Sequence, residues 1–288
     1  MMYQLPELIT STANSRVRLL RSLTDRKHRL HHGLFLAEGV RLAEEAVAAR
    51  IEPALLLYDP QQVNRQERAR AAVDALAVEA AQVIEGTRAV VESAGDAQHG
   101  QGIVFAVPFS SLRPQSTAHT HAPLMLLLDA IADPGNVGTL LRTAHAAGWT
   151  PLLTDGTADP YAPRAVRAGA GVHFSLGYLQ PRTSDDLVRL CGGVRQVLVA
   201  DARGDTPYHA IDWTLPTVLI VASEAHGAGP TTRQLATGSV RIPMPGGGES
   251  LNVGAAAAIL CFEAGRQRTQ VSSALPPGVR RTGVQRHR

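Results

Sequence analysis

The sequence predicts an α/β protein in which a mostly parallel sheet carries helices on both faces and follows a smaller α/β unit. Three observations support this class. Apolar runs of strand length alternate with helical segments from residue 124 to residue 268. Several runs, such as 124–130, are apolar almost throughout, which is typical of parallel strands covered on both faces. The segment 109–123 is polar, contains proline and lacks periodicity, so it is interpreted as a linker.

Residues 1–108 make up the first predicted unit. The segment 15–30 has the spacing of an amphipathic helix, because Val17, Leu20 and Leu23 share one face. Further helices are expected at 40–50 and 66–81, and strands at 33–39, 53–60 and 101–108. Prolines bound the strand at 53–60, which reads as buried because it is apolar at successive positions.

Residues 124–268 make up the second predicted unit, in which each apolar run is followed by a helical segment. The expected strands lie at 124–130, 150–156, 173–179, 196–201, 217–223 and 240–244. The expected helices lie at 136–148, 162–171, 184–193 and 230–238, with a last, alanine-rich helix that begins near Ser250. Three consecutive glycines precede that last helix, so the backbone before its start is not covered by side chains.

The composition is that of a globular protein, with 44% hydrophobic residues in 288. No apolar run approaches the roughly 20 residues that cross a bilayer, and the N-terminus lacks the pattern of a secretory signal. Cys191 and Cys261 are too few for a disulfide framework or a zinc site, and their apolar surroundings predict buried, reduced thiols. These features predict a cytoplasmic protein without a membrane segment or a bound metal.

Arginine is concentrated at both ends of the chain, although the formal net charge is only +3. The N-terminal cluster that is predicted to bind nucleic acid comprises Arg16, Arg18, Arg21, Arg26 and Arg29. A guanidinium binds phosphate through two parallel hydrogen bonds, so such a cluster favours a polyanionic partner. The last residues, 269–288, form a basic tail that is expected to be disordered and that either contributes to RNA binding or is simply solvated.

Three loops that follow predicted strands pair glycine with Asn, Glu or Ser, and ligands of open α/β sheets bind in loops of this kind. None of the loops carries a phosphate-loop or G-x-G-x-x-G pattern, which argues against ATP or a nicotinamide dinucleotide. The segment GESLN is close to the nucleophile elbow of serine hydrolases. However, Asn252 replaces its last glycine, and only Glu263 and His287 follow as acid and base, so a hydrolase is disfavoured.

The three loops resemble the motifs of the SpoU (TrmH-like) branch of the SPOUT class of RNA 2′-O-ribose methyltransferases. DPGNVGTLLRTAHAAG is similar to the first motif, IVASEAHGAG to the second, and RIPMPGGGESLNVGAAAAILCFEAGRQR to the third. Residues 1–108, with NSRVRLLRSL and FLAEGVRLAEEA, resemble the RNA substrate-binding domain that precedes many members. The resemblance spans roughly Thr10 to Arg268.

The resemblance implies a deep trefoil knot at the C-terminal end of the 124–268 domain, an exception to the rule that chains do not knot. It also implies S-adenosylmethionine as methyl donor, bent against the glycine-rich turn, and no metal. The positions that match the cofactor-binding residues of the family are Ala222, Gly227, Ile242, Leu251 and Asn252.

The positions that match the catalytic residues are Arg142, Asn136, Glu224, Ser250 and Asn252. Family mechanisms assign the first-motif arginine to the ribose 2′-hydroxyl. Because a guanidinium has a pKa above about 12 and is a poor base, we expect Arg142 instead to hold a phosphate or to stabilise the developing alkoxide. The other four residues are expected to orient Arg142 and the ribose.

The resemblance further implies a homodimer that acts on RNA, and the separate N-terminal domain favours ribosomal RNA as the substrate. Transfer RNA stays open as an alternative substrate. An antibiotic-resistance role and a non-catalytic RNA-binding protein also remain open at this stage.

Overall fold

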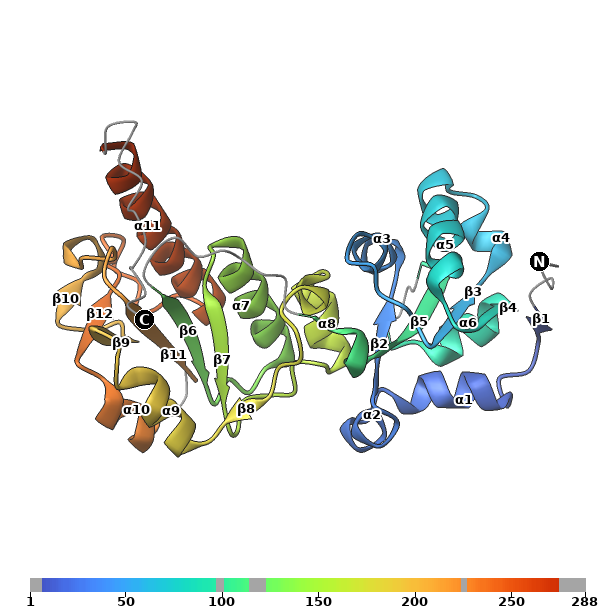
Figure 1. The fold of residues 1–288 in the computed structure, drawn as a ribbon, viewed down its shortest axis with the longest axis horizontal. Coiled ribbons are helices and arrows are strands. Elements are labelled where there is room, and N and C mark those ends of the chain that lie inside the picture. Colours follow the sequence, from blue (N-terminus) through green and yellow to red (C-terminus); the bar gives the residue numbers. More distant parts are fainter. Residues whose placement is uncertain (1–6, 97–100, 114–122, 224–226, 275–288) are drawn as a thin grey trace, which may run out of the picture.

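The structure is a computed structural model that describes residues 7–96, 101–113, 123–223 and 227–274 (Figure 1). Two sheets lie side by side along its long axis, and helix α8 (Pro163–Gly169) lies between them. The first sheet is built from residues before the 109–123 segment and the second from residues after it. Part of that segment, 114–122, lies outside the described residues.

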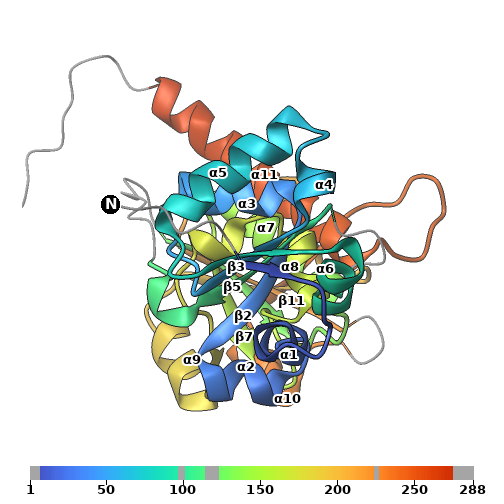
Figure 2. The same ribbon diagram turned by 90° about the vertical axis from the view of Figure 1, so that its right-hand side faces the viewer.

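The first sheet has the strand order β1-β4-β3-β5-β2 and is mixed, because β5 runs antiparallel to both of its neighbours. Its strands are β1 (Glu7–Ile9), β2 (Leu34–Glu38), β3 (Leu55–Tyr58), β4 (Val83–Gly86) and β5 (Ile103–Pro108). Its helices are α1 (Ser15–Ser22), α2 (Arg26–His32), α3 (Val40–Ala48), α4 (Pro60–Val63), α5 (Glu67–Glu79) and α6 (Arg88–Ala94). Helices α3 and α5 cover one face, and α1 and α6 the other (Figure 2).

The helix expected at 15–30 is two helices, α1 and α2, so this prediction is wrong in its middle. The first ends at Ser22, and Asp25 starts the second: its side chain accepts a hydrogen bond from Lys27 N at 2.7 Å as an N-cap. Thr24 immediately before it donates to the carbonyl of Arg21 and closes the preceding turn. Strands β1 and β4 and helices α4 and α6 were not predicted.

The second sheet has the order β10-β12-β9-β11-β6-β7-β8, and each of its described pairings is parallel. Its strands are β6 (Leu124–Asp129), β7 (Thr150–Thr154), β8 (Pro181–Arg182), β9 (Gln196–Ala200), β10 (Thr206–Pro207), β11 (Thr217–Ala222) and β12 (Gly238–Arg241). The other helices of this part are α7 (Pro134–Ala146), α9 (Ser184–Cys191), α10 (Pro230–Leu235) and α11 (Val253–Ala274).

Helices cover both faces of this sheet, as the fold class requires. Leu126 and Leu128 of β6 point toward α7 and α11, whereas Leu127 between them packs with Leu187 of α9. This alternation follows from the pleat of a strand that is buried on both sides. The predicted class, a mostly parallel α/β sheet, is therefore confirmed, and the trefoil knot stays a prediction.

Cys191 and Cys261 are buried and free, as predicted, and burial raises the pKa of both thiols. The strand expected at 173–179 is wrong: residues Val172–Phe174 form a 3₁₀ turn instead. His173 and Phe174 of that turn pack against Phe35 of the first sheet. Because they contact the first sheet, they do not form a strand of the second sheet. Within the described residues, no helix is both long and apolar enough to span a membrane.

Candidate active site

A cavity of about 760 Å³ opens at the carboxyl ends of β9, β11 and β12, beside the start of α11. Its volume suits a ligand the size of a nucleoside derivative. Its apolar wall is formed by Val199, Ala200, Val221, Ala222, Ala228, Val240, Ile242, Met244, Leu251, Val253 and Leu260. The sequence-predicted residues Ala222, Gly227, Ile242 and Leu251 all line it, and so does Ser250. Asn252 does not.

Two backbone turns shape the rim of this cavity. Gly227 has φ +65° and donates its N–H to the carbonyl of Ser223 at 2.8 Å, which folds the second-motif loop back on itself. Gly247 has φ +77° and bonds back to the carbonyl of Met244 at 3.1 Å. Glycine is required at both positions because side-chain-bearing residues rarely adopt such φ values. Gly246 and Gly248, by contrast, do not have a positive φ, and a Cβ at either would meet nothing within 4 Å.

Three charged side chains at the cavity were missed by the sequence analysis: Asp201, Asp205 and Arg233. Arg233 lies directly behind the Gly227 turn, where a Cβ at Gly227 would be 3.3 Å from its Nη2. Asp205 is held in place by Ser239, whose hydroxyl donates to its carboxylate at 2.8 Å. The cavity therefore offers both signs of charge around an apolar slot. The signal was available, since Asp201 is the last residue of a predicted strand.

Asn136 and Asn252 lie together, although 116 positions separate them in the sequence. The Asn252 amide donates from Nδ2 to Oδ1 of Asn136 at 3.4 Å, and its own Oδ1 accepts from Gly254 N at 2.9 Å at the start of α11. Asp133 caps α7 by accepting from Asn136 N at 2.9 Å. These bonds join the first turns of α7 and α11, which carry the first and third motifs.

Gly138 of the first motif has a packing function. A Cβ at this position would overlap the carbonyl oxygen of Ala165 and contact Ala168 at 2.8 Å, so only glycine allows α7 and α8 to approach this closely. Gly254 has the same function between α11 and α7, where a Cβ would lie 2.9 Å from Thr139. Glycine thus sets the distances between the three helices next to the site.

Asp129, at the end of β6, is a further residue that the sequence analysis missed. Its buried carboxylate accepts hydrogen bonds from Gly229 N at 2.7 Å, from the Thr232 hydroxyl at 2.5 Å and from the Thr154 hydroxyl at 3.0 Å. These donors come from the loop after β11, from α10 and from β7. Asp129 therefore ties three strand ends together beneath the second-motif loop.

Arg142 lies exposed on α7 and does not line the cavity. Among the described residues it takes part in no hydrogen bond or ion pair, so its guanidinium is available to a ligand. Glu224, the remaining residue of the predicted catalytic set, lies outside the described residues.

Of the five predicted RNA-binding arginines, Arg18, Arg21 and Arg26 are exposed and Arg16 is half-buried. Arg29 corrects the prediction, because its side chain is only 3% exposed. Its guanidinium donates to the carbonyls of Leu23 and Thr24, each at 2.8 Å, and to Asp159 at 2.6 Å. Burial and these bonds leave Arg29 unavailable to a phosphate. Helical spacing alone did not reveal this, since the carboxylate partner, Asp159, is 130 positions away in the sequence.

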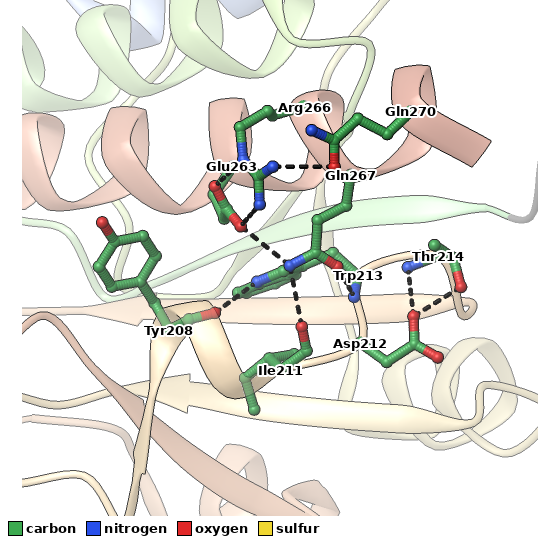
Figure 3. A network of polar contacts seen from close by, with 9 residues as sticks. All are labelled: Tyr208, Ile211, Asp212, Trp213, Thr214, Glu263, Arg266, Gln267 and Gln270. Atoms are coloured by element: carbon green, nitrogen blue, oxygen red, sulfur yellow. Dashed lines mark hydrogen bonds and ion pairs between the residues drawn. The ribbon is translucent and has the colours of Figure 1, made fainter. Parts of the chain in front are cut away.

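The second half of α11 is anchored to the segment before β11 (Figure 3). Gln267 accepts from Trp213 N at 3.0 Å and donates to the carbonyl of Ile211 at 3.1 Å, while Arg268 donates to the carbonyl of Trp213 at 2.8 Å. On the same helix, Glu263 pairs with Arg266 at 2.7 Å. Gln267 and Arg268 of the closing Arg-Gln-Arg thus anchor the helix whose first turns form a wall of the cavity.

Residues 123–262 match the SpoU rRNA Methylase family, and residues 14–105 match the MRM3-like substrate binding domain. The 23S rRNA (uridine(2479)-2'-O)-methyltransferase of Streptomyces viridochromogenes is 31% identical over 265 residues, covering 88% of this chain and 90% of the relative. The 23S rRNA (guanosine(2553)-2'-O)-methyltransferase RlmP of Bacillus subtilis is 29% identical, covering 88% of this chain and 97% of the relative.

Solved structures are similar over nearly the whole chain. The AdoMet-bound rRNA methyltransferase from Sinorhizobium meliloti has a TM-score of 0.73 at 29% identity, covering 90% of this chain and 97% of that one. The SpoU methyltransferase AviRb from Streptomyces viridochromogenes, in complex with AdoMet, has a TM-score of 0.74 at 28% identity, covering 89% and 98%. The parallel sheet and the cavity at its strand ends thus define an RNA methyltransferase of the class that the three motifs indicated. Within that class, the chain belongs to the SpoU rRNA methylase family, which confirms the resemblance.

Proposed function

We propose that this protein transfers the methyl group of S-adenosylmethionine to a ribose 2′-hydroxyl of ribosomal RNA. The observation that carries this proposal is the cavity formed by the second and third motifs, with Ala222, Ile242 and Leu251 in its wall, in a chain of the SpoU family. Relatives named as 23S rRNA 2′-O-methyltransferases support ribosomal RNA as the substrate class.

The residues around the cavity suit S-adenosylmethionine chemically. An adenine ring fits an apolar slot such as that between Ile242 and Leu251, with main-chain N–H and C=O groups at its edge. Arg233 offers a partner for the methionine carboxylate, while Asp201 and Asp205 suit its ammonium group and the ribose hydroxyls. When bound, the sulfonium supplies an electrophilic methyl group.

We assign the acceptor side of the reaction to α7. Arg142 would hold a phosphate next to the target ribose or stabilise the developing alkoxide, since a guanidinium is a poor base. The bonded pair Asn136 and Asn252 would keep the first turn of α7 in register with the cavity. Ser250 lies at the cavity wall. Glu224 keeps its predicted orienting role. Positioning of this kind contributes several kcal/mol to a transfer between two bound groups.

We also propose that the protein acts as a cytoplasmic homodimer. Ile259 and Phe262 of α11 are one turn apart, and 37% and 54% of their surfaces are exposed. An apolar pair on an exposed helix suits contact with a second copy. Light scattering on the wild type and on Phe262→Glu tests this: the wild type is expected at twice the chain mass and the variant at a lower mass. A monomeric wild type would contradict the homodimer.

Labelled methyl transfer tests the activity. Wild-type protein with methyl-labelled S-adenosylmethionine should label ribosomal RNA, and alkaline digestion should leave the labelled nucleotide linked to its 3′ neighbour, because a 2′-O-methyl group blocks cleavage there. Arg142→Ala should bind the cofactor but not transfer label. Label that is released in single nucleotides by alkali would instead indicate base methylation.

A further inference from the structure

Helix α8 lies between the two halves of the molecule (Figure 1). Two of its arginines, one turn apart, bond it to both halves. Arg164 forms an ion pair with Asp133 at 2.8 Å, and Asp133 is the N-cap of α7. Arg167 crosses to the first sheet, where it donates to Glu38 at 2.5 Å and to Asp96 at 2.8 Å. One short helix therefore links the first-motif helix to the N-terminal sheet.

The acceptor of Arg167 is unusual in its burial. Glu38 ends strand β2, and its side chain is only 4% exposed. Its second oxygen accepts the N–H of Asp96 at 3.2 Å. A carboxylate this deeply buried requires a cationic partner, because an unpaired buried charge costs several kcal/mol. The position of Glu38 therefore constrains the position of Arg167, and the reverse.

A second bond, four residues before α8, links the same helix region to the predicted RNA-binding surface. Asp159 accepts from Arg29 of α2 at 2.6 Å, and Arg26 of the same helix stays exposed beside it at 4.0 Å. Tyr161 packs on Phe35 of β2, with ring centroids 5.0 Å apart. The helix that presents Arg26 to solvent is thus attached directly to the segment that leads into α8.

The opposite side of α8 contacts the first-motif helix without a spacer. The backbone of Ala165 occupies the space that a side chain at Gly138 would need. Any shift of α8 would therefore be transmitted to α7, which carries Asn136 and Arg142. Bonded or packed contacts thus run from α2 through α8 to α7.

We propose that Arg167 is a positioning residue that fixes the register between the RNA-binding surface of α1 and α2 and the methyl-transfer site on α7, so that a single nucleotide of the bound RNA is methylated. This inference rests on the proposed function. It follows from the contacts because RNA held on one sheet must place one ribose at a site built on the other. A misplacement of about 1 Å is enough to lower a transfer rate by about a hundredfold.

The test compares Arg167→Met with Arg189→Met, which removes an exposed arginine from an intrahelical ion pair on α9. Transfer rates, the KM for ribosomal RNA, the cofactor Kd by calorimetry and the position of the methyl group by primer extension are measured for each. Arg167→Met should lower kcat by about 10- to 100-fold and spread label to neighbouring nucleotides, with RNA KM and cofactor Kd within about twofold of wild type. Arg189→Met should behave as wild type.

A double variant separates positioning from stability. In Arg167→Met alone, the buried Glu38 carboxylate loses its bond to the guanidinium, so the melting temperature should fall. Adding Glu38→Gln removes the buried negative charge and should restore the melting temperature, whereas the spread of label should persist. Folded single and double variants that methylate only the wild-type nucleotide at the wild-type rate would overturn the proposal. A wild type that binds ribosomal RNA but transfers no label would instead overturn the proposed function itself.

Discussion

Charged side chains have opposite environments in two regions of the molecule. One region is the cavity at the strand ends, and the other is the joint between the two sheets, where α2 and β2 contact residues 159–174. At the cavity, Asp201 and Arg233 are exposed around an apolar slot. At the joint, Glu38 and Arg29 are almost completely buried and bonded to partners more than a hundred positions away in the sequence. The first arrangement leaves polar groups open for a ligand, and the second pairs buried charges of opposite sign within the protein.

This difference distinguishes residues that are available to bind a ligand from residues that stabilise the folded structure. The side chain of an exposed arginine such as Arg142 does not stabilise the fold, so its replacement should affect activity alone. A buried arginine such as Arg29 satisfies a carboxylate, so its replacement should affect folding first. Sequence position does not distinguish the two, since Arg26 and Arg29 lie on the same short helix.

The largest effect is expected at Arg142. Arg142→Ala should lower the transfer rate by about 10²- to 10³-fold, the loss seen when one charge-stabilising donor is removed from an active site. The melting temperature and the cofactor Kd should stay unchanged, because the side chain is exposed and lies outside the cavity. Arg142→Lys keeps the charge but loses the two-pronged geometry, so it should recover only part of the rate. Full activity in the lysine variant would contradict the role assigned here.

The joint should weaken in mild acid because of His173. Its ring is fully buried, and burial lowers its pKa from 6.5 to about 4, while Nε2 donates to the carbonyl of Pro160 at 2.8 Å. In the unfolded chain His173 is protonated as the pH falls below about 6.5, whereas in the folded chain it is protonated only near pH 4. Stability should therefore fall as the pH drops through this window, by about 3 kcal/mol in total, and stay level above it.

Denaturant unfolding of the wild type and His173→Gln between pH 7.5 and pH 4, values that bracket this window, measures the effect. Glutamine keeps a donor for the Pro160 carbonyl but does not titrate, so the difference between the two proteins should shrink or reverse as the pH falls. A constant difference across the range would show that His173 does not carry the pH dependence.

A smaller effect is expected at the cavity from Arg233→Met. Loss of the guanidinium should raise the Kd for S-adenosylmethionine about tenfold, which corresponds to roughly 1.4 kcal/mol. The Kd for 5′-methylthioadenosine should not change, because that molecule lacks the methionine carboxylate. Calorimetry with both molecules checks this, and Arg195→Met, an exposed arginine outside the cavity, is the matched control. Equal weakening of both ligands would show that Arg233 shapes the cavity rather than binding the carboxylate.

The smallest effects belong to the exposed arginines of the N-terminal surface. Arg18→Gln and Arg26→Gln should each weaken RNA binding a few-fold and reduce the slope of log K against log[salt] by about 1. Arg29→Gln should instead lower the melting temperature. Filter binding over a series of salt concentrations, together with thermal unfolding, separates the two classes. An unchanged salt slope in both Arg18→Gln and Arg26→Gln would remove this surface from the RNA interface.

The cavity was predictable in outline and the joint was not, for physical reasons. Five predicted residues meet at the cavity because motifs at the ends of parallel strands converge on one edge of a sheet. The joint depends on pairs such as Arg167 with Glu38, 129 positions apart, which no local pattern encodes. The same limit explains why the 173–179 strand was wrong. Its apolar residues were assigned to the second sheet, but Phe174 packs with the first.

Short elements also escaped prediction. Strands β1 and β10 have only three and two residues, too few for a period to be recognised. The break between α1 and α2 was marked by Thr24 and Asp25, a cap signal that the basic pattern of the segment obscured. Long apolar runs such as β6 and β11 were placed correctly because burial on both faces leaves a continuous signature.

The most direct test of the account is the position of the methyl group that the wild type transfers to unmodified ribosomal RNA from labelled S-adenosylmethionine, mapped beside Arg142→Ala. We predict label at one nucleotide, in an alkali-resistant linkage, and none with Arg142→Ala although the variant binds cofactor normally. Equal labelling by Arg142→Ala, or no labelling by a wild type that binds both cofactor and RNA, would contradict the assignment of 2′-O-methyl transfer to this site.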